Sequence, residues 1–148
     1  MTTIMFFLAL SAWADSSPTV KPYTQGEARQ APSGSATVWR IAGAPEGAKQ
    51  AFFGVLEIQP GAKVPVHRDT TEEYIFIIEG RGEMTIDGVT TAVLPGWAVF
   101  MPANAEVSFE VTGEIPVRAV QFFAGQGPES KYDGWVPANE PVKAGATP

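Results

Sequence analysis

Short runs of apolar and β-branched residues alternate with turn-forming residues along most of the chain, and no segment has the period of an amphipathic helix. The runs recur about every ten residues, a spacing typical of a β-sandwich or β-barrel. They predict strands at Ala36–Ile41, Gln50–Ile58, Tyr74–Ile78, Glu83–Ile86, Thr90–Leu94, Ala98–Met101, Glu106–Val111 and Val117–Phe123. The pattern therefore predicts an all-β fold.

A two-residue turn is expected between two of these runs. Asp87-Gly88 separates Met84-Thr85-Ile86 from Val89-Thr90-Thr91. Both turn residues tolerate the positive φ that a tight hairpin requires. We therefore predict a hairpin at this point.

The N-terminus resembles a targeting segment. Residues 4–10 form a short apolar run, and Ala12-Trp13-Ala14 supplies a small-residue cleavage pattern before Asp15. We predict a cleaved signal peptide at residues 1–14 and a secreted or periplasmic protein, although no basic residue precedes the run. The alternative is a cytoplasmic protein with an apolar N-terminus. The run is shorter than the roughly 20 residues that a spanning helix needs, so we expect no membrane span in the mature chain.

The remaining chain divides into three parts. Residues 15–35 are rich in Ser, Pro, Thr, Gln, Gly and Ala and are predicted to be a linker or an N-terminal arm. Residues 36–124 carry the predicted strands and form one domain. Residues 125–148 form a Pro/Gly-rich tail. Because the tail contains Tyr132 and Trp135, we expect it to pack back onto the domain at least as far as Val136.

Composition excludes several classes of function. The formal net charge is −6 with a pI near 4.7, so the phosphates of a nucleic acid would be repelled and nucleic acid is not an expected partner. The chain has no cysteine, which excludes disulfides, a thiolate metal site and a cysteine nucleophile.

The middle of the chain has a regular spacing of glycine, polar and proline residues. The first group is Gly61, His67, Asp69, Glu73 and Gly80. The second group is Gly96, Pro102, Asn104, Val107 and Val111. This spacing resembles the two motifs of the cupin superfamily, Gly-x5-His-x-His-x3,4-Glu-x6-Gly and Gly-x5-Pro-x-Gly-x2-His-x3-Asn. The resemblance implies a cupin-type double-stranded β-helix, a jelly-roll-like barrel.

In cupins, two histidines and a glutamate from the first motif and one histidine from the second hold a divalent metal inside the barrel. His67 and Glu73 match this pattern, whereas Asp69 and Val107 replace the other two histidines. Asn104 replaces a glycine, and asparagine is tolerated at positive φ. The resemblance therefore implies a metal site that has lost part of its ligands.

The predicted ligand pocket contains His67, Asp69, Glu73, Val107 and Gln121. His67 and Asp69 are two residues apart and share a face if both lie in a strand. Gln121 is the one amide in an apolar strand, and it either points into the pocket or is a hydrogen-bonded core amide.

A divalent metal is the first candidate cofactor. His67, Asp69 and Glu73 form a set that can bind Mn²⁺, Fe²⁺ or Zn²⁺. We expect weak binding, because aspartate is shorter than histidine and Val107 cannot coordinate. The absence of any cofactor is the equal alternative. His67 is also a candidate general base.

The strand at Tyr74–Ile78 is apolar on both faces. Glu73, Ile75 and Ile77 are expected to face the barrel interior, so Tyr74, Phe76 and Ile78 face outward. A row of large apolar side chains rarely stays exposed to water. We predict that a homodimer interface covers it, with the N-terminal arm as the alternative.

Three functions are compatible with these residues. The first is binding of a small organic molecule in the barrel. The second is catalysis, either by a metal-dependent oxygenase or isomerase that uses His67, Asp69 and Glu73, or by a metal-free isomerase, epimerase or lyase with His67 as general base. The third is a structural dimer with a filled barrel. The fold does not decide among them.

Overall fold

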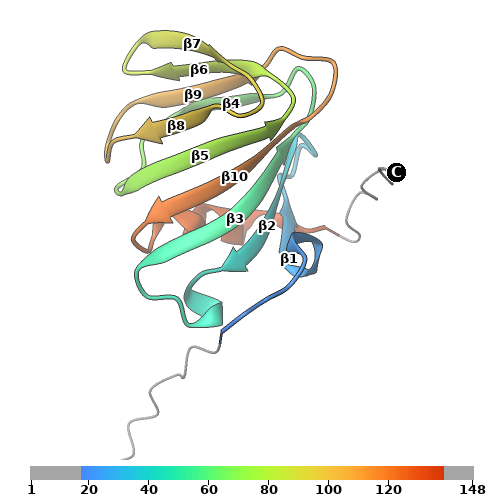
Figure 1. Cartoon of the computed structure of the whole chain (residues 1–148), viewed down its shortest axis with the longest axis vertical. Coiled ribbons are helices and arrows are strands. Elements are labelled where there is room, and N and C mark those ends of the chain that lie inside the picture. The colour runs from blue at the N-terminus through green and yellow to red at the C-terminus, as the bar shows by residue number, and fades with distance from the viewer. Residues whose placement is uncertain (1–17, 139–148) are drawn as a thin grey trace, which may run out of the picture.

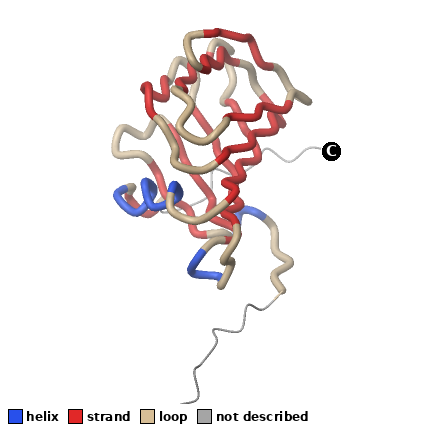
Figure 2. The backbone as a smooth tube through the Cα atoms, turned by 90° about the vertical axis from the view of Figure 1, so that its left-hand side faces the viewer, coloured by secondary structure: helices blue, strands red, loops and turns tan. Residues whose placement is uncertain are grey.

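The computed structural model describes residues 18–138, which form eleven strands and three short 3-10 segments (Figures 1 and 2). The strands are β1 (Glu27–Gln30), β2 (Ala36–Ala42), β3 (Ala51–Ile58), β4 (Lys63–His67), β5 (Glu72–Glu79), β6 (Gly82–Ile86), β7 (Val89–Val93), β8 (Ala98–Met101), β9 (Val107–Val111), β10 (Val117–Ala124) and β11 (Val136–Pro137). The 3-10 segments are η1 (Tyr23–Gln25), η2 (Ala44–Glu46) and η3 (Pro128–Gly134). The predicted signal peptide and the last ten residues of the tail lie outside the described residues.

Each predicted strand is present, with ends within two residues of the prediction. The prediction missed β1, β4 and β11. Among residues 18–138, no helix has the length and apolar character needed to cross a membrane.

The strands form two sheets. One has the order β11-β1-β2-β3-β10-β5-β8 and the other the order β4-β9-β6-β7. The main core contains residues of both sheets, for example Ile77 from β5 and Val111 from β9, which are both almost fully buried. The sheets therefore face each other around one interior, which confirms the predicted all-β, jelly-roll-like barrel (Figure 1).

Two turn predictions are confirmed. Asp87 and Gly88 both have positive φ, and they connect β6 to β7 with Ile86 opposite Val89. Asn104 has a φ of 64°. Asparagine thus adopts the left-handed conformation at the position where the cupin motif has glycine.

Alternation along β5 follows the prediction, and β9 shows the same pattern. In β5, Glu73, Ile75 and Ile77 are buried, whereas Tyr74 and Phe76 are 40% and 48% exposed. In β9, residues 107, 109 and 111 are buried and those between them are partly exposed. In both strands, every second side chain thus points into the barrel, and the apolar ones among these join the main core.

The segments that precede and follow residues 36–124 in the sequence each add a strand to the larger sheet. Strand β1 pairs with β2, with Ala28 opposite Trp39, and β11 pairs with β1. Tyr23 packs edge-on against Trp39, with ring centroids 5.3 Å apart. Strand β1 thus lies beside β2 in the same sheet, and Tyr74 and Phe76 stay exposed.

The tail packs against the barrel as predicted. In η3, Tyr132 is 3% exposed and joins a second core cluster with Val38, Phe52 and Phe123. Its ring lies 6.1 Å from that of Phe52 and 4.9 Å from that of Trp135. This packing fixes η3 at one end of the barrel interior.

Candidate functional site

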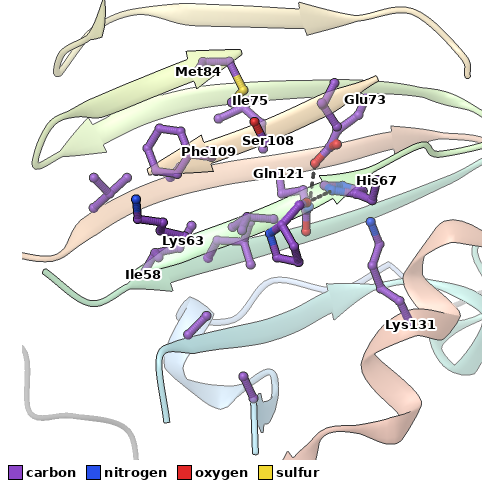
Figure 3. Close-up of a pocket in the computed structure, with 18 of the residues that line it drawn as sticks. Ile58, Lys63, His67, Glu73, Ile75, Met84, Ser108, Phe109, Gln121 and Lys131 are labelled. Atoms are coloured by element: carbon purple, nitrogen blue, oxygen red, sulfur yellow. Dashed lines mark hydrogen bonds between the residues drawn. The ribbon is translucent and has the colours of Figure 1, made fainter. Parts of the chain in front are cut away.

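A cavity of about 590 Å³ lies inside the barrel. All five predicted pocket residues line it: His67, Asp69, Glu73, Val107 and Gln121. Its walls are mostly apolar. Figure 3 shows His67, Glu73, Gln121 and Lys131 together at one end, with Met84, Phe109 and Ile58 toward the other. The cavity therefore has a cluster of polar groups at one end, whereas the other end is mostly apolar, with Lys63 and Ser108 among its lining residues (Figure 3).

His67 is the last residue of β4, where the pairing with β9 is irregular between Val64 and His67. Its Nδ1 lies 2.9 Å from the carbonyl oxygen of Pro65. A carbonyl oxygen only accepts, so Nδ1 carries a proton and donates it. Nε2 lies 3.4 Å from Oδ2 of Asp69. This contact with Asp69 raises the pKa of His67, although burial works in the opposite direction.

Strand β4 ends at His67, so Asp69 does not lie in a strand. The expectation that the two residues share one face of a strand was therefore wrong. Asp69 follows β4 in a loop, where its carbonyl accepts a 2.7 Å hydrogen bond from the backbone N–H of Asn104. Its carboxylate still lines the cavity beside His67. Burial alone would raise the pKa of Asp69, but hydrogen bonds from His67 and Lys131 outweigh burial and lower it.

Glu73 ends a chain of buried hydrogen bonds. The Tyr132 hydroxyl donates to Oε1 of Gln121 at 2.8 Å, and Nε2 of Gln121 donates to Oε1 of Glu73 at 2.6 Å. Gln121 is therefore both a pocket residue and a hydrogen-bonded core amide. Burial raises the pKa of Glu73, and the Gln121 hydrogen bond offsets part of this shift. Burial also raises the pKa of Tyr132.

Val107 is an apolar wall residue. It is 4% exposed, belongs to the main core cluster and lies opposite His67 in the pairing of β4 with β9. Its neighbour Glu106 lies at the surface, where its carboxylate accepts a 2.8 Å hydrogen bond from Arg68. Neither residue supplies a ligand from this wall.

Two residues of the polar end, Lys131 and Tyr132, were not predicted to belong to the pocket. Both come from η3, and both line the cavity. The Lys131 ammonium lies 2.9 Å from Oδ1 and 2.8 Å from Oδ2 of Asp69. It also lies 4.8 Å from the ring centroid of Phe123. The aromatic residues of the tail signalled that it packs on the barrel, but no motif marked Lys131.

Two features of the polar end fit a divalent metal. His67, Asp69 and Glu73 each offer a ligand atom, and these atoms all lie within 4.8 Å of one another. In addition, the bond from Nδ1 of His67 to a backbone carbonyl leaves Nε2 as the ligand atom, the usual arrangement at metal sites. One imidazole and two carboxylates suit Mn²⁺, Fe²⁺ or Zn²⁺.

Two other features oppose the metal. Lys131 engages both carboxylate oxygens of Asp69, and Val107 offers no ligand from β9, the strand that pairs with β4 beside His67. Among the described residues, this cluster thus offers three side chains that could hold a metal.

Comparisons with known proteins agree with this architecture. The family profile of the cupin domain matches residues 54–123. The dimethylsulfoniopropionate lyase DddW of Ruegeria pomeroyi is 36% identical over 70 residues, which are 46% of each chain. The chain spans about half the length of the curated relatives it matches.

Solved structures give the same result for the fold. The polyketide cyclase RemF from Streptomyces resistomycificus superposes with a TM-score of 0.67 at 21% identity, over 76% of this chain and 82% of that one. An RmlC-like cupin from Shewanella frigidimarina gives a TM-score of 0.65 at 15% identity, over 76% of this chain and 96% of that one. With the motif spacing, the barrel and the family profile in agreement, this chain belongs to the cupin superfamily.

Proposed function

We propose that the chain binds a small organic molecule inside its barrel. The observation that carries the proposal is the cavity of about 590 Å³ with apolar walls and polar groups gathered at one end. Small-molecule sites commonly have this size and this distribution of polar groups. The apolar part of the ligand lies among Ile75, Met84 and Phe109, and its polar group faces His67 and Lys131.

The polar end favours a ligand oxygen that accepts hydrogen bonds. An ammonium has three N–H donors, and Lys131 directs two of them at Asp69. The third is available to a carbonyl or carboxylate oxygen. Because Asp69 neutralises most of the charge of Lys131, the site does not require an ionic ligand.

A screen of ligands with a cavity-filling control tests the proposal. The melting temperature is measured with a panel of small carboxylic acids, esters and ketones, for the natural protein and for Ala119→Phe. Ala119 lines the cavity and is 3% exposed, so phenylalanine at this position takes up ligand space. We expect members of the panel to stabilise the natural protein by mass action and to have little effect on the variant. Equal effects on both proteins would contradict binding inside the barrel.

A second candidate function is catalysis at the same site. Two observations favour it: the His67–Asp69–Glu73 cluster and the similarity to a lyase over 70 residues. In a lyase or isomerase, His67 would remove a proton from the ligand at Nε2, while Pro65 holds Nδ1 and fixes the ring. In the metal-dependent alternative, His67, Asp69 and Glu73 would hold a metal that supplies Lewis-acid polarisation of a ligand oxygen, and Nε2 of His67 would then be a metal ligand instead of the base.

A histidine variant separates catalysis from binding. His67→Gln keeps a polar side chain but removes the titrating group. If the site is catalytic, this variant abolishes turnover of a bound ligand and keeps its binding. If the natural protein leaves each bound compound unchanged, with and without added metal, the binding function stands alone.

Export from the cytoplasm is a further part of the proposal. It rests on the apolar run and the cleavage pattern of residues 1–14. N-terminal sequencing of the protein from its native cells tests it. A mature chain that begins at Asp15 supports export, and an intact Met1 in the cytoplasm contradicts it.

A further inference from the structure

The Lys131 ammonium occupies the position at Asp69 that a divalent metal would need. It lies within 2.9 Å of both carboxylate oxygens of Asp69, and Oδ2 is the same atom that faces Nε2 of His67. The Asp69 carboxylate is only 12% exposed. A metal bridging His67 and Asp69 must therefore displace or closely approach this ammonium.

The backbone of η3 holds Lys131 in place. The next residue, Tyr132, is buried between Phe52 and Trp135. The residue after it, Asp133, accepts a 2.8 Å ion-pair hydrogen bond from Arg40, whose side chain is 9% exposed. Lys131 is thus fixed by packing on its C-terminal side, and its ammonium lies over the ring of Phe123.

The same segment reaches the second carboxylate of the cluster. Tyr132 donates to Gln121, and Gln121 donates to Glu73. Adjacent residues of η3 therefore supply the cation at Asp69 and the start of the hydrogen-bond chain to Glu73. Segment η3 thus contacts Asp69 directly through Lys131 and is linked to Glu73 through Gln121.

We propose that Lys131 is the resident cation of this site and that it lowers the affinity for divalent metals. The inference rests on the His67–Asp69–Glu73 cluster and does not depend on which organic molecule fills the barrel. A bound metal would either repel the nearby ammonium or force Lys131 to leave Asp69 and its contact with Phe123. Both events cost free energy, and solvent screens this ion pair only in part, because the side chains of Lys131 and Asp69 are 33% and 12% exposed.

Calorimetric titration of tag-free protein with Mn²⁺ or Zn²⁺, without organic ligand, tests the proposal. Lys131→Met keeps the length and the apolar stem of the side chain but removes its charge. We expect its metal affinity to exceed that of the natural protein roughly tenfold or more, as removal of one nearby positive charge implies. Lys131→Gln should show the same direction of change.

Two variants serve as controls. Lys131→Arg keeps the positive charge, so its metal affinity should stay at the level of the natural protein. Lys63→Met removes a charge from another lysine of the cavity lining, whose ammonium pairs with Glu110 at 2.9 Å instead of the cluster. Its metal affinity should also stay unchanged.

The proposal is overturned if folded Lys131→Met and Lys131→Gln bind metal within twofold of the natural protein. It is also overturned if Lys131→Arg or Lys63→Met gains as much affinity as Lys131→Met. If Lys131→Met does not fold, as judged by circular dichroism, Lys131→Gln and Lys131→Arg decide by the same criterion. Because no organic ligand enters these titrations, a failure of ligand binding leaves their result unaffected.

Discussion

His67 and Val107 are register partners on the neighbouring strands β4 and β9, so an imidazole and an isopropyl group lie side by side on one wall of the cavity. Val107 occupies the position at which the second cupin motif has a histidine. Strand β9 thus contributes packing instead of a ligand at this position, and Val107 adds no fourth ligand to the cluster of His67, Asp69 and Glu73.

The missing ligands can be restored. In Asp69→His/Val107→His the four motif positions carry the complete cupin pattern, and the carboxylate partner of Lys131 is removed. We expect the affinity for Mn²⁺ or Zn²⁺ to rise at least about tenfold, measured by calorimetry, because each added ligand contributes free energy to metal binding.

The natural protein provides the contrast for this experiment. Its melting temperature should change little with divalent metal, and His67→Ala should behave in the same way. A rise of several degrees that is lost in His67→Ala would contradict the account of a weakened metal site.

His67 is the one histidine in the chain, so its ring gives a single proton NMR titration curve. We expect a pKa above the ordinary value of 6.5, because Asp69 stabilises the charged ring. Asp69→Asn should lower this pKa.

The pKa shift of His67 also predicts how stability depends on pH. A raised pKa in the folded state stabilises the fold below the unfolded value of 6.5, and the contribution is lost as pH rises through the folded pKa. Urea unfolding of His67→Gln should therefore show a larger loss of stability near pH 5.5 than near pH 9. A loss that is equal at both pH values, or larger at pH 9, would contradict the assignment.

The buried hydrogen bonds that link Tyr132, Gln121 and Glu73 predict that loss of the hydroxyl destabilises the fold more at Tyr132 than at Tyr74. Tyr132→Phe leaves the Gln121 carbonyl without its donor and should lower the free energy of unfolding by about 1–3 kcal/mol. Tyr74→Phe removes a hydroxyl that bonds to the exposed Glu72, and it should change stability by less than about 0.5 kcal/mol. Denaturant unfolding of both variants measures the difference, and equal losses would show that the buried chain adds nothing to stability.

The outer face of β5 and β10 predicts self-association. Tyr74, Phe76, Phe100 and Phe122 are 36% to 50% exposed and border one shallow groove. Because residues 18–35 leave this face uncovered, we expect a homodimer by packing of these sheets. Light scattering should give twice the chain mass for the natural protein and the single-chain mass for Phe76→Glu. A natural protein that stays monomeric at high concentration would contradict this prediction.

Much of the barrel could be predicted because its strands are encoded locally. Alternation in residues such as Phe109 and Val111, and turn residues such as Asp87 and Gly88, depend only on neighbours in the sequence. Strand β1 was missed because its four residues, Glu27–Gln30, have no apolar alternation. It forms by pairing with β2, which the local pattern does not reveal.

The site was predictable only in part. Motif spacing placed His67, Glu73 and Val107 correctly in the cavity, and it placed Asp69 in the cavity without identifying its loop. Lys131 lies 62 positions from Asp69 in the chain and belongs to no motif. Its role follows from the packing of Tyr132 in η3, a tertiary contact that a single sequence does not show.

Native mass spectrometry of the purified protein tests the central claim, ligand binding inside the barrel, most directly. The natural protein and Ala119→Phe are compared under the same gentle conditions, after addition of the compound from the screen that stabilises the natural protein most. The account predicts a one-to-one complex with the natural protein and little or none with Ala119→Phe. Equal occupancy of both proteins, or of neither, would contradict the claim.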